Sequence, residues 1–116
     1  AITQPVFSPE ALEHFLEATT PEIPLIAGIW PFVTLRSAEF LANEMPGVHV
    51  PDELVNRMRL AQRSGEDAEL EEGVAIALEM INATQGLVQG FHLTAPHRNV
   101  QVALRVLRES GILATA

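Results

Sequence analysis

Residues 90–99, GFHLTAPHRN, join an apolar run to a polar cluster with two histidines, a threonine and an arginine. Phe91 and Leu93 alternate with His92, which predicts a strand ending near Leu93. A helix is predicted from Asn99 onward, because apolar residues recur there at helical spacing: Val100, Val102, Ala103, Val106 and Leu107. The polar cluster therefore lies on a strand-to-helix turn. In α/β folds such turns lie at the carboxyl end of the sheet, where ligands bind.

Two earlier stretches predict further strands of the same sheet. Residues 1–4, AITQ, read as a short buried strand that Pro5 ends, because proline cannot continue a hydrogen-bonded ladder. Residues 23–30, IPLIAGIW, are apolar at both alternating sets of positions. That pattern is typical of a strand covered on both faces of a parallel sheet.

Helices are predicted between these strands. Ser8 and Pro9 form a helix start, and the buried stripe of that helix is expected to be Leu12, Phe15 and Leu16. Later helices are predicted from Thr34 to about Glu44, from Pro51 or Asp52 to Ser64-Gly65, and up to Gly86. The apolar side of the last and longest of these is expected to be Leu70, Val74, Ala77, Leu78 and Ile81.

The resulting order is strand, helix, strand, three helices, strand, helix, which is typical of a parallel α/β sheet. A closed (β/α)8 barrel needs eight strands and typically about 250 residues. The chain has 116 residues and about three strands. We therefore expect a partial (β/α)8 TIM barrel, with about three parallel strands alternating with five or six helices. Residues 1–116 are interpreted as the single carboxyl-terminal portion of a larger barrel whose amino-terminal half is absent.

The composition argues against several classes of partner. Seven basic residues against fifteen acidic ones give a net charge of -8, which would repel a phosphate backbone, so we expect no nucleic-acid partner. No apolar run approaches the ~20 residues that span a bilayer, so we expect no membrane partner and a cytoplasmic location. The absence of cysteine excludes a disulfide framework, a thiol nucleophile and a thiolate zinc site.

The polar residues at the strand ends are expected to meet at one rim of the sheet. Gln4 offers one acceptor and two donors, which suits the edge of a heterocycle. Arg98 presents a planar fork that suits a carboxylate, a phosphate or a flat ring. Each has a structural alternative: Gln4 can satisfy backbone groups, Arg98 can be a solvated surface residue, and Trp30 can belong to the core.

The other polar residues predict no complete catalytic set and no metal site. His92 is interpreted as structural, pointing into the barrel or hydrogen-bonding a neighbouring strand. His97 has the chemistry of a general acid or base but no partner that the sequence identifies. His14 and His49 lack a second ligand at metal spacing and are interpreted as surface residues. The acids of the long helix are interpreted as a solvated amino terminus: Glu66, Asp67, Glu69, Glu71 and Glu72.

Three stretches together resemble a known family: AITQPVFSPEALEHFLE from residue 1, IPLIAGIWPFVTLRSAEFLANEMPGVHVP from residue 23, and GLVQGFHLTAPHR from residue 86. They are similar to the carboxyl-terminal part of methylenetetrahydrofolate reductase, a flavin-dependent barrel enzyme, over nearly the whole chain. The Ala-Pro pair after the last strand is similar to the branch fused to homocysteine methyltransferase. The resemblance implies an oxidoreductase of one-carbon metabolism and methionine biosynthesis that reduces methylenetetrahydrofolate to 5-methyltetrahydrofolate.

The resemblance also implies roles for individual residues. Gln4 occupies the position of the glutamine that hydrogen-bonds the pterin of folate, and Arg98 that of an arginine that approaches folate or nicotinamide. Trp30 falls where large apolar residues line the pocket, and Thr94 stands where the family commonly has a tyrosine. A folate-stacking aromatic residue is implied near Phe40 or Leu41. The predicted substrate-binding set is therefore Gln4, Trp30, Thr94 and Arg98.

The resemblance implies FAD and NAD(P)H for the full-length enzyme, whose proton donor and most flavin contacts come from the missing half. We therefore expect this chain alone to bind no cofactor and to be inactive, with folate and the missing half as its partners. Two alternatives stay open. The chain can be a non-catalytic assembly module that pairs into homo-oligomers through exposed strand edges, or part of another barrel enzyme that holds a phosphate near its last strands.

Overall fold

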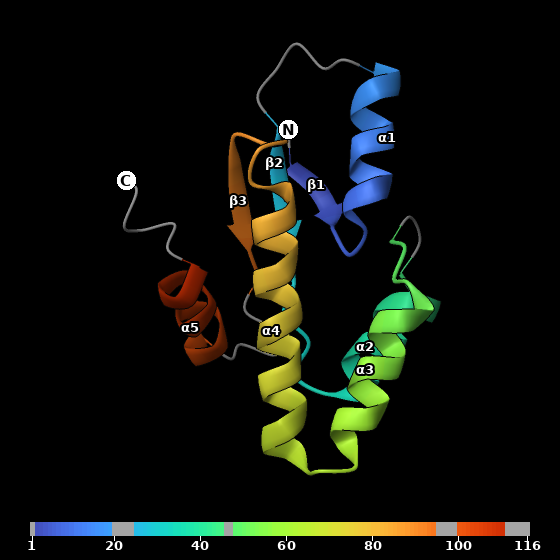
Figure 1. Ribbon diagram of the computed structural model, residues 1–116, viewed down its shortest axis with the longest axis vertical. Coiled ribbons are helices and arrows are strands. Elements are labelled where there is room, and N and C mark those ends of the chain that lie inside the picture. The colour runs from blue at the N-terminus through green and yellow to red at the C-terminus, as the bar shows by residue number, and fades with distance from the viewer. Residues whose placement is uncertain (1, 20–24, 46–47, 95–99, 111–116) are drawn as a thin grey trace.

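The computed structural model describes residues 2–19, 25–45, 48–94 and 100–110 of the chain. Within these residues it contains three strands and five helices (Figure 1). In chain order they are β1 (Ile2–Pro5), α1 (Pro9–Thr19), β2 (Ile26–Ile29), α2 (Leu35–Asn43), α3 (Asp52–Gln62), α4 (Glu66–Thr84), β3 (Gly90–Leu93) and α5 (Val100–Ser110). The predicted order of strands and helices is confirmed.

The three strands form one parallel sheet in the order β1-β2-β3. Gly28 is the register partner of both Pro5 and His92, so the strands end at nearly the same level. The ladders continue just past the strands, because the Val6 N–H donates to the Gly28 carbonyl at 2.9 Å and the Thr94 N–H donates to the Ile29 carbonyl at 2.9 Å. The predicted parallel sheet is therefore correct, although β2 is shorter than the predicted residues 23–30.

Helix α4 is the long crossover helix, and it runs along one face of the sheet in the sense opposite to the strands (Figure 1). Helices α2 and α3 lie beyond the carboxyl ends of the strands, beside the first half of α4. The main core joins the sheet to α2, α3, α4 and α5 and includes Ile29, Phe32, Leu41, Met58 and Val106. A smaller apolar cluster lies under α1 and consists of Val6, Leu12, Leu25, Ala27 and Val88.

Two helices begin with the caps that the sequence predicts. The Ser8 hydroxyl accepts a hydrogen bond from the Ala11 N–H at 3.2 Å at the start of α1. Thr34 and Ser37 form a reciprocal capping box at the start of α2. Gly65, between α3 and α4, has a φ of 104°, a left-handed conformation that favours glycine. The break predicted at Ser64-Gly65 is therefore explained by this turn.

Two predictions of side-chain exposure are wrong, one for Phe15 and one for Glu69. Phe15 is 48% exposed, because α1 turns only the Leu12 side toward the sheet. On α5, Val100 is exposed, because the helix buries Val102 and Val106 on its other side. Glu69 was predicted to be solvated among the acids of α4, but it is only 5% exposed. On α4 the buried side includes Val74, Ala77 and Ile81 as predicted, whereas Leu70 and Leu78 are half-buried.

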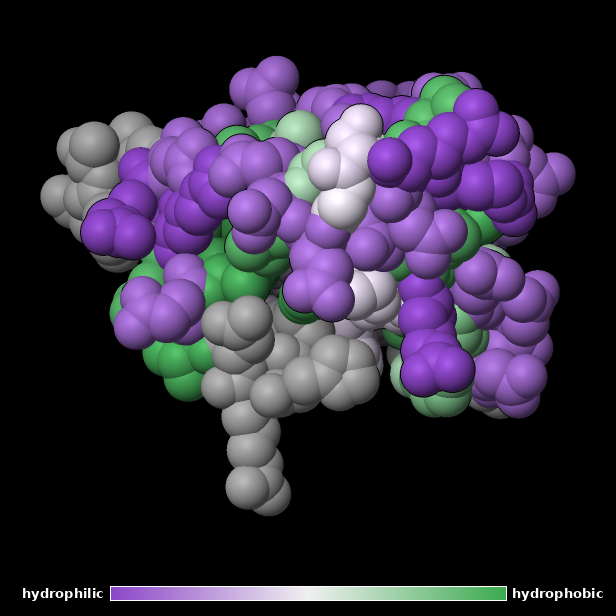
Figure 2. Space-filling view, turned by 90° about the horizontal axis from the view of Figure 1, so that it is seen from below, coloured by the Kyte–Doolittle hydropathy of each residue, from purple (hydrophilic) through white to green (hydrophobic). Residues whose placement is uncertain are grey.

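The end of the molecule where α3 joins α4 is mainly hydrophilic (Figure 2). The acids at the start of α4 contribute to this surface, but two of them are paired with arginines of neighbouring helices. Glu71 forms an ion pair with Arg105 of α5 at 2.6 Å, and Glu72 forms one with Arg57 of α3 at 2.6 Å. Among the described helices none combines the length and the apolar character that a membrane crossing needs.

Arg57 joins α3 to α4 through two carboxylates. Its Nε donates to Glu72 at 2.6 Å, and its two terminal nitrogens donate to the two oxygens of Glu79 at 2.9 and 2.6 Å. The hydrogen bonds from Arg57 lower the pKa of Glu79 below the ordinary 4.5. The folded state therefore favours the ionised carboxylate, and this stabilisation is present above about pH 4.5 and is lost as the pH falls through the lowered pKa.

We expect Arg57→Met to lower the free energy of unfolding by roughly 0.5–1 kcal/mol near pH 7, because the pair is partly exposed and screened by solvent. The difference from the wild type should shrink as the pH falls below about 4.5, the ordinary pKa of the Glu79 carboxyl. Urea unfolding between pH 3 and pH 7 measures both. Arg59→Met is the matched control, because Arg59 hydrogen-bonds the Asn56 amide at 2.5 Å rather than a carboxylate. A difference that stays constant with pH would contradict the assignment.

Candidate substrate-binding site at the carboxyl end of the sheet

The parallel sheet brings three segments together at its carboxyl edge. Gln4 lies in β1 one residue before Pro5, Trp30 directly follows β2, and Thr94 directly follows β3. Because the strands are adjacent and parallel, these three backbone positions lie at one edge of the sheet. The backbone therefore brings Gln4, Trp30 and Thr94 to this edge, and their part in substrate binding stays a prediction. Arg98 and His97 lie outside the described residues.

A pocket of about 370 Å³ opens beside β2 at this edge. Among the described residues its wall consists of Trp30, Thr34, Arg36, Ser37 and Phe40. Trp30 comes from the end of β2, and the other four come from the first two turns of α2 and its cap. The two aromatic residues are partly exposed, Phe40 by 49%, so the pocket has an apolar wall that a flat ring can contact.

Three backbone donors at the start of α2, beside this pocket, are already used. The Ser37 N–H donates to the Thr34 hydroxyl at 3.2 Å, and the Thr34 N–H donates to the Ser37 hydroxyl at 3.3 Å. The Leu35 N–H donates to the Glu69 carboxylate at 2.7 Å. Because these three groups are satisfied, the start of α2 offers a phosphate fewer free donors than helix N-termini often do.

Arg36 is the positively charged group of the pocket wall. Its side chain is exposed, and it forms no ion pair with any residue in the described part of the chain. By contrast, Arg57 and Arg105 each hold two carboxylates. The pocket therefore combines an apolar wall with a guanidinium that is available to a carboxylate or another anionic group of a ligand.

The sequence identified part of this pocket. Trp30 was predicted, and of the two candidates for a folate-stacking residue Phe40 lines the pocket, whereas Leu41 is fully buried in the core. Arg36 was not predicted as a site residue. Its signal is present in the sequence, because Arg36 and Phe40 are four residues apart and therefore share one face of a helix that starts at Thr34.

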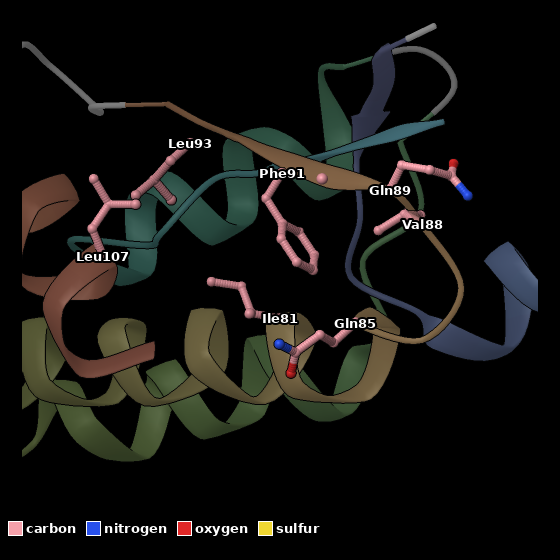
Figure 3. A pocket seen from close by; sticks show the side chains of 8 residues that line it. Ile81, Gln85, Val88, Gln89, Phe91, Leu93 and Leu107 are labelled. Carbon is pink, nitrogen blue, oxygen red and sulfur yellow. The ribbon is translucent and has the colours of Figure 1, made fainter. Parts of the chain in front are cut away.

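The histidines of the described residues lie apart from this pocket. His14 and His49 are exposed, as predicted for surface residues. Phe91 and Leu93 point toward α4 and α5 (Figure 3), so the alternation of the strand places His92 on the opposite face of the sheet, where it is exposed. No hydrogen bond joins His92 to another described residue, and its structural role stays a prediction.

A second pocket, of about 210 Å³, lies between β3 and the helices α4 and α5. Figure 3 shows the Phe91 ring pointing from β3 toward Ile81 of α4, with Leu93 and Leu107 beside it. Gln85 and Gln89 also line this pocket, and the Gln89 side chain accepts a hydrogen bond from the Leu25 N–H at 2.6 Å. The pocket lies on the helix-covered face of the sheet, away from the converging strand ends.

A comparison with models of known protein families identifies the family of the chain. The model of the methylenetetrahydrofolate reductase family matches residues 1–111. The chain belongs to this family. Membership of the methylenetetrahydrofolate reductase family implies oxidoreductase activity in folate metabolism for the full-length enzyme. No curated protein matches the chain.

Methylenetetrahydrofolate reductases generally use FAD and NAD(P)H, whereas most of the described hydrogen-bond donors at the start of α2 are already used within the protein. At the strand-end pocket, the hydroxyls of Thr34 and Ser37 and two backbone N–H groups of α2 are already hydrogen-bonded within the protein. A dinucleotide requires several such donors for its phosphates. No group of three or more potential metal ligands occurs among the described residues.

Proposed function

We propose that this chain forms the carboxyl-terminal part of a TIM-barrel methylenetetrahydrofolate reductase domain and supplies one wall of its folate pocket. The reaction of the complete domain is the reduction of 5,10-methylenetetrahydrofolate to 5-methyltetrahydrofolate. The observation that carries the proposal is the parallel sheet whose carboxyl edge combines Gln4, Trp30 and Thr94 with a pocket lined by Phe40 and Arg36.

Each residue has a distinct part in this proposal. Trp30 and Phe40 offer apolar surface to the aromatic parts of folate. The amide of Gln4 pairs with the donor and acceptor edge of the pterin. Thr94 lies beside the substrate at the end of β3, and Arg98 approaches folate or the nicotinamide. Binding and orientation of folate are thus the contribution of this chain, and we derive no redox step from its residues.

In this proposal, the remaining strands of the barrel pair with the two outer strands of the sheet, β1 and β3. Among the described strands, β1 and β3 each pair only with β2, so each has an unpaired edge. The pocket of Figure 3 lies beside the β3 edge and has an apolar lining that a neighbouring element can fill. The amino-terminal half would supply the flavin contacts and the proton donor, which is why we propose that the 116 residues alone are inactive.

One observation favours a second function, in which the chain is an assembly module. Val100 and Leu104 of α5 are exposed apolar residues, by 55% and 45%. An exposed apolar helix face near an open strand edge invites pairing between copies. Sedimentation separates the two proposals: oligomers that bind no folate support the assembly module, and folate binding supports the reductase.

We expect Phe40→Ala to weaken folate binding by the natural protein about tenfold, because it removes an aromatic wall worth about 1.4 kcal/mol. Calorimetric titration with folate measures the change. Phe40 is half-exposed, so the variant should unfold at nearly the same urea concentration as the wild type. Leu60→Ala is the matched control, because Leu60 is 60% exposed on α3 and does not line the pocket.

A wild-type protein that binds no folate would contradict the proposed function. Unchanged affinity in Phe40→Ala, with normal folate binding by the wild type, would remove Phe40 from the site and leave the function in place. Titration with a sugar phosphate tests the remaining alternative, a barrel enzyme with a phosphate site.

A further inference from the structure

Glu69 is a buried carboxylate in the first turns of α4, and its partner belongs to a different helix. It is 5% exposed, and its Oε2 atom accepts the Leu35 N–H of α2 at 2.7 Å. No ion pair joins Glu69 to a described arginine. The amino-terminal ends of α2 and α4 therefore converge on one carboxylate, and both helix dipoles favour a negative charge there.

Gly73 lies one turn farther along α4, on the same side as Glu69. A Cβ atom at Gly73 would be 1.7 Å from the Phe32 carbonyl oxygen and 2.6 Å from its carbon. The backbone of α4 therefore lies directly against Phe32, just after β2. Together, Glu69 and Gly73 hold both ends of the segment Phe32–Leu35, which connects β2 to α2.

This segment carries the strand-end pocket. Trp30 lies two residues before it, Thr34 lies within it, and Arg36 and Phe40 follow in the first two turns of α2. The capping box of α2 satisfies the Ser37 N–H from within the same helix, whereas the Leu35 N–H is satisfied from α4. The local cap fixes the start of the helix, and the Glu69 bond fixes the place of that start relative to α4.

We infer that Glu69 is a positioning residue for the substrate pocket: it holds the first turn of α2 against α4 and thereby sets the distance between the Trp30 wall and the Phe40 wall. This inference rests on the proposed function, because it assigns a binding consequence to the pocket. A hydrogen bond from a backbone N–H to a carboxylate is shorter and stronger than a neutral one, which suits this role.

The test uses the natural protein with Glu69→Ala, which removes the acceptor, and Glu69→Gln, which keeps one acceptor oxygen. We expect Glu69→Ala to accelerate hydrogen exchange at the Leu35 amide by about tenfold or more. It should also raise the KM for the folate substrate about tenfold and change kcat by less than about twofold. Glu69→Gln should recover most of the wild-type KM. Glu66→Ala, an exposed acid in the same turn of α4, is the matched control and should behave as the wild type.

Each outcome decides one proposal. Faster exchange at Leu35 with a KM within twofold of the wild type would overturn the positioning role and leave the proposed function intact. If the wild type neither binds nor reduces folate, the proposed function fails. Exchange at the Ser37 and Phe40 amides then decides the inference, which is overturned if Glu69→Ala leaves that exchange unchanged. If Glu69→Ala does not fold, Glu69→Asp replaces it, because the shorter acid keeps the charge but not the reach. A wild-type KM in Glu69→Asp overturns the inference.

Discussion

Gly73→Ala should destabilise the chain by about 3 kcal/mol, the upper part of the usual range for overpacking a core. The added methyl group would lie 1.7 Å from the Phe32 carbonyl oxygen, far inside any van der Waals contact. The obstacle is backbone rather than the end of a flexible side chain, so no rotamer change relieves it. The clash can be relieved only if α4 moves away from the segment Phe32–Leu35, or if that segment moves out of its packed position.

Urea unfolding of Gly73→Ala measures this loss of stability, and Gly86→Ala is the matched control. Gly86 lies just after α4, and an added Cβ there would meet nothing within 4 Å. Gly86→Ala should therefore be neutral or stabilising by a few tenths of a kcal/mol, because alanine reduces the freedom of the unfolded chain. If the free energy of unfolding of Gly73→Ala is within about 0.5 kcal/mol of the wild-type value, α4 does not lie as close to Phe32 as described.

The sequence predicted the order of strands and helices along the chain, and with it a parallel sheet, and it predicted two helix caps, because apolar runs, turn residues and capping residues are local patterns. Apolar runs bounded by proline and glycine predicted β1 and β2, and Thr34 identified the start of α2. Burial on individual helices was predicted less well. Phe15 has the spacing of a buried residue, but α1 lies at the margin of the sheet and contacts it only around Leu12. Where a helix lies relative to its neighbours is a tertiary property that periodicity does not contain.

In the candidate site, too, the sequence predicted what depends on local patterns and missed what depends on tertiary placement. Trp30 and Gln4 were predicted because their strands end where parallel strands always bring their carboxyl ends together. Glu69 was misinterpreted because a run of acids at a helix start normally faces solvent. Its partner, the Leu35 N–H, is 34 residues away in the sequence. No local pattern distinguishes the one acid of the run that reaches another helix from those that do not.

The second large effect is expected at Phe32, which links the core to the carboxyl edge of the sheet. Phe32 is 0% exposed and stacks on Phe7, with ring centroids 4.8 Å apart and planes at 9°. Phe7 follows β1 and Phe32 follows β2, so the stack ties together the segments after two neighbouring strands. We expect Phe32→Ala to lower the free energy of unfolding by about 3–5 kcal/mol, because it loses transfer energy and leaves a cavity.

Phe15→Ala provides the same chemical change on an exposed ring and should cost less than about 1 kcal/mol. A double-mutant cycle with Phe7→Ala then separates the stacking from the burial, and we expect a coupling of about 0.5–1.5 kcal/mol. The backbone of α4 at Gly73 lies against the Phe32 carbonyl, and Phe7 packs on the Phe32 ring. Loss of this ring should therefore also increase the mobility of the segment that leads to Thr34 and the pocket. A coupling near zero would mean that Phe7 and Phe32 are each held by their own packing. In that case the contact with α4 positions the segment after β2 without help from the stacked rings.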